Sequence, residues 1–212
     1  MAADRAARAR EEPQMNDVDT TGLLVVDVQN DFCHGGALAV PNGDRVVGTL
    51  NQYIETAVAR GVTVYASRDW HPGVTSHFKP YGGPWPVHCV QGSDGARFHP
   101  DLRLPSAAIV VTKGESPDSP GYSAFEGRTP GGNSFLADLR ERGIDHLVVG
   151  GLATDYCVKH SVLDALSAGL QVTILEDAIA GVDPEDSASA LIQMRDRGAE
   201  AGTGSDVFAG KS

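Results

Sequence analysis

Short apolar runs rich in β-branched residues recur along the chain from Gly22 onward, and segments with helical spacing lie between them. Such runs, apolar at every position, are typical of strands buried on both faces. Their alternation with helices predicts a parallel sheet covered on both sides, a three-layer αβα fold. The predicted strands span residues 23–27, 62–67, 108–112, 144–149 and 171–175, and the predicted helices span residues 41–60, 134–142, 154–168 and 183–197.

Local signals support several of these elements. Asp183 followed by Pro184 is a favoured pair for the N-cap and the first helical position. Residues 199–212 carry a weak pattern for an edge strand. Within residues 41–60, one helical face collects the apolar side chains Val46, Val47, Leu50, Ile54 and Val58.

The chain has 212 residues, of which 41% are hydrophobic, enough for one α/β domain with a full core. Residues 1–20 are rich in Ala, Arg and acidic groups, which predicts a disordered tail before a single domain at residues 21–212. The net charge of −11 repels phosphate backbones and anionic lipid, so we expect neither nucleic-acid nor membrane binding.

The sequence predicts a protein of the reducing cytoplasm. No apolar run reaches membrane-spanning length, and the first residues lack the apolar stretch of a signal peptide. The three cysteines, Cys33, Cys89 and Cys157, form no disulfide framework. We therefore expect a cytoplasmic protein whose partner is a small molecule, and a homo-oligomer is compatible with the sequence.

Cys157 follows the predicted strand 144–149 and two glycines, at the start of the predicted helix 154–168. Thr154 is placed to cap that helix, and backbone N–H groups there would favour a thiolate and hold an oxyanion. This position predicts a cysteine nucleophile. The alternative is a buried structural thiol.

Other reactive side chains also follow predicted strands. Asp27 ends the first, Asp69 and His71 follow the second, and Lys113 follows the third. In open parallel sheets, ligands bind outside the carboxyl ends of the strands, where these groups would meet. Asp27 could accept the proton of Cys157, and Lys113 could stabilise both negative charges.

The stretch 69–106 is long, irregular and dense in Gly, Pro, His and aromatic residues, which indicates a functional loop. Asp69, His71, His77 and His88 form a set that suits Zn, Fe, Mn or Co. The alternative is a solvated histidine-rich loop. His34 and His99 are further histidines without a predicted role.

Aromatic side chains flank both groups of reactive residues and could hold a flat ring. They are Phe32, Trp85, Tyr122, Phe125 and Tyr156. For Tyr122 and Phe125, ordinary core packing is the alternative.

Several stretches together resemble the isochorismatase-like cysteine hydrolases and, within them, the nicotinamidases. The similarity runs from residue 22 to about 181. It rests on Val26-Asp-Val-Gln-Asn-Asp-Phe-Cys33, Ser67-Arg-Asp-Trp-His71, Ser76-His-Phe78, Gly83-Pro-Trp-Pro-Val-His-Cys-Val-Gln-Gly92, Thr112-Lys-Gly114, Tyr122-Ser-Ala-Phe125 and Gly151-Leu-Ala-Thr-Asp-Tyr-Cys-Val158.

The resemblance implies a six-stranded, mainly parallel, Rossmann-like sheet and a cis peptide between Leu152 and Ala153. It implies a triad of Asp27, Lys113 and Cys157, an oxyanion hole from the Ala153 and Cys157 N–H groups, and one divalent metal ion. For that ion, Zn is favoured and Fe or Mn is possible, with Asp69, His71, His77 and His88 around it. The substrate would contact Phe32, Trp85, Tyr122 and Tyr156.

The activity that the resemblance implies is hydrolysis of nicotinamide to nicotinate and ammonia through a cysteine thioester, in NAD salvage. One alternative is another amidase of the superfamily, acting on a carbamoyl or ureido compound without need of the metal set. A second is a catalytically silent metal-binding module. Bound metal tests the first alternative, and ammonia release tests the second.

Overall fold

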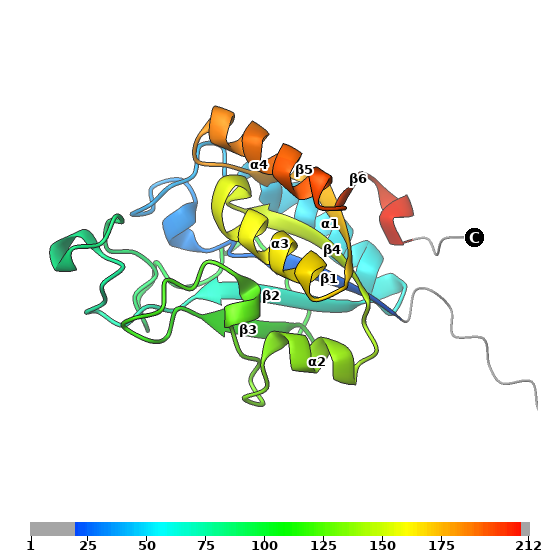
Figure 1. Ribbon diagram of the computed structural model, residues 1–212, viewed down its shortest axis with the longest axis horizontal. Coiled ribbons are helices and arrows are strands. Elements are labelled where there is room, and N and C mark those ends of the chain that lie inside the picture. The colour runs from blue at the N-terminus through cyan, green and yellow to red at the C-terminus, as the bar shows by residue number, and fades with distance from the viewer. Residues whose placement is uncertain (1–19, 209–212) are drawn as a thin grey trace, which may run out of the picture.

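A single six-stranded sheet organises the computed structural model, which describes residues 20–208. The strand order is β3-β2-β1-β4-β5-β6, and every neighbouring pair is parallel. The predicted three-layer, mainly parallel fold is confirmed (Figure 1). The predicted tail lies outside the described residues, except for Thr20.

The strands begin and end close to the predicted positions. They are β1 (Thr21–Val26), β2 (Thr63–Asp69), β3 (Ile109–Lys113), β4 (His146–Leu152), β5 (Gln171–Ala180) and β6 (Glu200–Gly202). β5 is longer than the sequence predicts, and β6 is the weak edge strand expected within residues 199–212. Among the described residues, no helix is long and apolar enough to cross a membrane.

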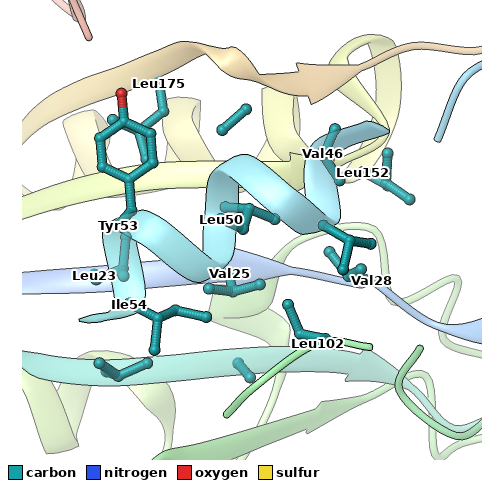
Figure 2. Packing of buried hydrophobic residues seen from close by; sticks show 14 of the residues in the cluster. Leu23, Val25, Val28, Val46, Leu50, Tyr53, Ile54, Leu102, Leu152 and Leu175 are labelled. Carbon is teal, nitrogen blue, oxygen red and sulfur yellow. The ribbon is translucent and has the colours of Figure 1, made fainter. Parts of the chain in front are cut away.

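The helices cover both faces of the sheet. They are α1 (Arg45–Ala59), α2 (Phe135–Glu141), α3 (Lys159–Ser167) and α4 (Pro184–Asp196). α1 packs on one face, where its side chains meet Leu23 and Val25 of β1 (Figure 2). α2, α3 and α4 pack on the other, against Leu24 and Val26. Neighbouring residues of β1 thus enter opposite cores, because side chains alternate along a strand.

Capping side chains mark the starts of α2 and α4. The Ser134 side chain accepts a hydrogen bond from Ala137 N–H at 3.3 Å, and that of Asp183 accepts from Glu185 N–H at 2.8 Å. One core prediction is wrong, because Val58 is 51% exposed, whereas Ala57 beside it is buried. Val58 falls in the last turn of α1, which the chain leaves at Arg60.

Candidate active site

The turn after β4 positions Cys157. The Leu152–Ala153 peptide is cis, as the resemblance implies, and a π-helical turn (Thr154–Val158) leads into α3. The expected cap by Thr154 is wrong. Ala153 takes the extended N-cap position instead and accepts backbone hydrogen bonds from Tyr156 and Val158. Thr154 is already the first residue of the π-helical turn.

Lys113, at the end of β3, joins the other two members of the predicted triad. Its Nζ lies 2.7 Å from Asp27 Oδ2 and 3.6 Å from Cys157 Sγ, and it donates to Gly121 O at 2.7 Å. It also donates to Asp69 Oδ1. The ammonium group therefore stands between a carboxylate, a thiol and one end of the predicted metal set, although these residues are far apart in sequence.

The two oxygens of Asp27 have different partners. Oδ1 accepts a hydrogen bond of 2.7 Å from Ser67 Oγ. Oδ2 forms the ion pair with Lys113 but accepts no hydrogen bond of normal geometry from the described residues. Asp27 and Cys157 offer ligand atoms within 4.8 Å of each other. Oδ2 is therefore the oxygen available to take the thiol proton.

Burial is the largest single influence on the pKa of each triad residue. It raises the pKa of Cys157 well above the ordinary value, and Lys113 offsets this only in part. Burial likewise raises the pKa of Asp27. For Lys113, burial opposes the charge, but Asp27 and Asp69 outweigh it and raise the pKa. A cysteine whose pKa is raised in this way needs a base to become a nucleophile.

The predicted metal ligands converge beside Lys113. His71, His77 and His88 are buried, and their ligand nitrogens lie within 4.8 Å of one another. Asp69 Oδ2 lies 3.6 Å from His71 Nε2 and 4.0 Å from His88 Nε2. Spacings of this size match donor atoms that share one small cation.

The protonation of these histidines suits a metal. The Nδ1 atoms of His71 and His88 face the carbonyl oxygens of Gly114 and Pro86 at 3.2 and 2.8 Å. A carbonyl only accepts, so Nδ1 carries the proton and Nε2 keeps its lone pair. His71 Nε2 is buried without a hydrogen-bond partner among the described residues, the atom that a cation would satisfy.

The two remaining ligands have suitable charges. Burial lowers the pKa of His77 to about 4, which leaves the ring neutral near pH 7. Burial disfavours the charge on Asp69, but the Lys113 ammonium holds the pKa of that carboxyl well below its usual range. Neutral imidazoles and an ionised carboxylate are the forms that bind a divalent metal.

A pocket connects the thiol to the histidines. Its lining includes Cys157, Ala153, Asp69, His77 and His88, and all the aromatic residues predicted to hold the substrate, Phe32, Trp85, Tyr122 and Tyr156. Trp85 Nε1 donates to Tyr122 OH at 2.8 Å, and the Trp85 and Tyr156 rings lie 4.9 Å apart. Phe125 does not line the pocket and packs against Phe135, which is the core role left open for it.

Sequence reasoning missed part of this site. Leu38, Val40 and Val182 complete the apolar wall of the pocket. Their segments carry no chemical motif, so only the fold shows that they meet. Two buried polar residues were also missed, Ser67 beside Asp27 and Gln29 beside Asp69.

A second cluster joins Cys33, Asp44 and His99, and none of the three lines this pocket. His99 Nε2 lies 3.5 Å from Asp44 Oδ1, and His99 Nδ1 accepts a hydrogen bond of 3.2 Å from Asp101 N–H. The neutral ring therefore carries its proton on Nε2, which faces the carboxylate. This arrangement is an ordinary hydrogen-bonded pair, and it does not present a lone pair to a metal.

Known proteins are similar to this chain in sequence and in fold. Residues 21–206 match the isochorismatase domain. The chain is 47% identical over 195 residues to the nicotinamidase of Escherichia coli (strain K12), which covers 84% of this chain and 92% of that protein.

Two solved structures match the fold of this chain over nearly their whole length. The pyrazinamidase of Pyrococcus horikoshii in complex with zinc has a TM-score of 0.81 and 41% identity, covering 87% of this chain and 99% of that one. PnC1 from L. infantum in complex with nicotinate has a TM-score of 0.78 and 33% identity, covering 90% and 96%. With the family match spanning almost all of residues 20–208, the chain belongs to the isochorismatase family, and its relatives there include nicotinamidases.

Proposed function

We propose that this chain hydrolyses nicotinamide to nicotinate and ammonia through a thioester on Cys157, in the salvage of NAD. One observation carries the proposal. A Lys113-centred triad and a cluster of three histidines meet at one aromatic-lined pocket, whose lining includes Cys157, His77 and His88. The similarity to nicotinamidases and to a structure with bound nicotinate supports the same substrate.

The pocket would orient the substrate before reaction. Phe32 and Trp85, both in the pocket lining, would hold the pyridine ring between them. Asp69, His71, His77 and His88 would hold one divalent ion, and zinc, present in the solved pyrazinamidase, suits this nitrogen and oxygen set. When bound, that ion would coordinate the ring nitrogen, which positions and polarises the substrate.

Acylation begins with proton transfer from Cys157 to Asp27 Oδ2, the oxygen without a hydrogen bond. Lys113 stabilises the negative charge as it moves from the carboxylate to the sulfur, because it contacts both. The thiolate attacks the amide carbon, and the N–H groups of Ala153 and Cys157 hold the oxyanion. Asp27 then returns the proton to the amide nitrogen, and ammonia leaves.

Deacylation uses the same base. Asp27 removes a proton from water, the hydroxide attacks the thioester carbon, and that proton passes to Cys157 as the C–S bond breaks. The nicotinic acid that is released gives its carboxylic proton to ammonia or solvent and becomes nicotinate. Every proton that enters Asp27 leaves it again, so the triad is restored after each turnover.

Ammonia release tests this proposal. We expect release from nicotinamide, with one metal ion per chain measured on the same sample, and weaker release from carbamoyl and ureido compounds. Benzamide keeps the shape and the amide but lacks the ring nitrogen, so its kcat/KM should be much lower. Removal of the metal should narrow that gap, chiefly by slowing nicotinamide hydrolysis. Equal efficiency on both amides with metal bound would contradict recognition of the ring nitrogen.

A further inference from the structure

Ser67, on β2, holds the carboxylate at the end of β1. Its Oγ donates to Asp27 Oδ1 at 2.7 Å, and its carbonyl accepts from Asp27 N–H at 3.2 Å. Both residues are fully buried. Asp27 has a φ of 48°, in the left-handed region that non-glycine residues rarely adopt. The hydroxyl occupies one oxygen and leaves Oδ2 to Lys113 and the thiol.

Gln29, just after β1, holds the backbone of Asp69, the residue that ends β2. Its Oε1 accepts from Asp69 N–H at 2.7 Å, and its Nε2 donates to Asp69 O at 2.8 Å and to Ala96 O at 2.9 Å. This side chain is also fully buried. Its amide thus engages both backbone groups of Asp69, as the backbone of a neighbouring strand would in a parallel ladder.

The two interactions are reciprocal. A side chain of β2 fixes the carboxylate that follows β1, and a side chain that follows β1 fixes the residue that ends β2. The two fixed carboxylates, Asp27 and Asp69, both contact Lys113 Nζ. Their separation therefore determines how the ammonium is shared between the triad and the histidine side of the pocket.

We propose that Ser67 and Gln29 form a brace of positioning residues, in which Ser67 orients Asp27 for proton transfer and Gln29 places Asp69 between Lys113 and the histidines. The catalytic meaning of the brace rests on the proposed function. Its geometric meaning does not, because thiol reactivity and metal retention are measurable without nicotinamide.

Substitution of Ser67 and substitution of Gln29 should cause different defects. Ser67→Ala should slow alkylation of Cys157 by iodoacetamide and lower kcat by roughly 10- to 100-fold, the range typical of lost outer-shell partners. It should leave KM and metal content close to those of the native protein. Ser67→Thr keeps the hydroxyl and should restore most of the alkylation rate.

Gln29→Glu removes both donors of the amide while it keeps the shape of the side chain. We expect weaker metal retention against a chelator, by about 10- to 100-fold, together with slower alkylation of the metal-free protein. Gln29→Met tests the same loss without a new buried charge and should weaken metal retention in the same direction.

Asn51 supplies a matched control. Its buried amide also clamps backbone, donating to Asp101 O and accepting from Arg103 N–H at 2.8 Å each, but it does not line the pocket. Asn51→Asp should lower the thermal midpoint, as Gln29→Glu does, and leave alkylation and metal retention unchanged.

The brace would be overturned if Ser67→Ala alkylated at the native rate, or if Gln29→Glu and Asn51→Asp changed metal retention equally. If the native protein released no ammonia from nicotinamide while the alkylation and metal results held, the brace would stand and the proposed function would fail.

Discussion

Among residues 20–208, two clusters combine cysteine, carboxylate and histidine side chains, and the backbone partners of their histidines place the ring proton on opposite nitrogens. In the cluster beside the pocket, His71 and His88 donate from Nδ1 to backbone carbonyls and keep the Nε2 lone pair free. In the second cluster, His99 accepts at Nδ1 from a backbone N–H and directs its Nε2 proton at Asp44. The backbone partner of each ring, and not the residue types, separates a metal ligand from a structural pair.

The cysteines of the two clusters differ in the same way. Cys157 has Lys113 within 3.6 Å, which counteracts part of the effect of burial on its pKa. Cys33 has Asp44 nearby, and burial together with that carboxylate raises its pKa to about 12. A neighbouring cation and a base therefore mark the nucleophile, although both thiols are buried.

The largest effect on activity should come from replacing the Cys157 thiol, and the Cys33 thiol serves as the comparison. Cys157→Ala should lower nicotinate formation by at least about 10³-fold, because the attacking atom is lost. Cys33→Ser should keep most of the activity per folded molecule. Circular dichroism checks both folds, and substantial turnover by Cys157→Ala would refute the covalent mechanism.

The next largest effect should be on metal content, which distinguishes His71 from His99. His71→Ala removes an atom that no described residue satisfies, and we expect its metal affinity to fall by more than about 100-fold, beyond the range seen for outer-shell changes. His99→Ala should retain one ion per chain. Elemental analysis after dialysis gives both values. Loss of metal in His99→Ala, or two ions in the native protein, would break the distinction drawn from the ring protonation.

Replacing Asp27 or Lys113 should have a smaller effect, which is measured as the rate of Cys157 alkylation. Asp27→Asn removes the proton acceptor and Lys113→Ala removes the cation, so both should slow alkylation of Cys157 near neutral pH. Asp44→Asn, beside Cys33, serves as the control and should leave that rate unchanged. An unaltered rate in both triad variants would show that these residues support the core and not the thiol.

The smallest effect concerns stability in alkali. Folded Cys33 keeps its proton to a pKa of about 12, while the unfolded chain releases it near 9.0. This difference stabilises the fold fully below pH 9 and is lost as the pH rises towards 12. Urea unfolding midpoints should therefore fall less steeply over that interval in Cys33→Ser than in the native protein. Identical slopes would mean that Cys33 ionises equally in both states.

The sequence predicted what depends on periodicity and on strand ends. Buried strands are apolar at every position, and the parallel sheet brought Asp27, Lys113 and Cys157 together because all three follow strands. The misses have local or long-range causes. Thr154 resembles a cap, but the extended conformation of Ala153 moves the helix start by one residue. Gln29 and Ser67 act on partners 40 residues away, and nothing in their own segments shows which backbone groups they meet.

The thioester on Cys157 is the central claim, and mass spectrometry of the protein quenched during turnover of nicotinamide tests it most directly. We expect a nicotinoyl group on the peptide that contains Cys157, none on the peptide that contains Cys33, and none at all in Cys157→Ala. Steady release of nicotinate with no acyl group on Cys157, or with the acyl group on another residue, would contradict it.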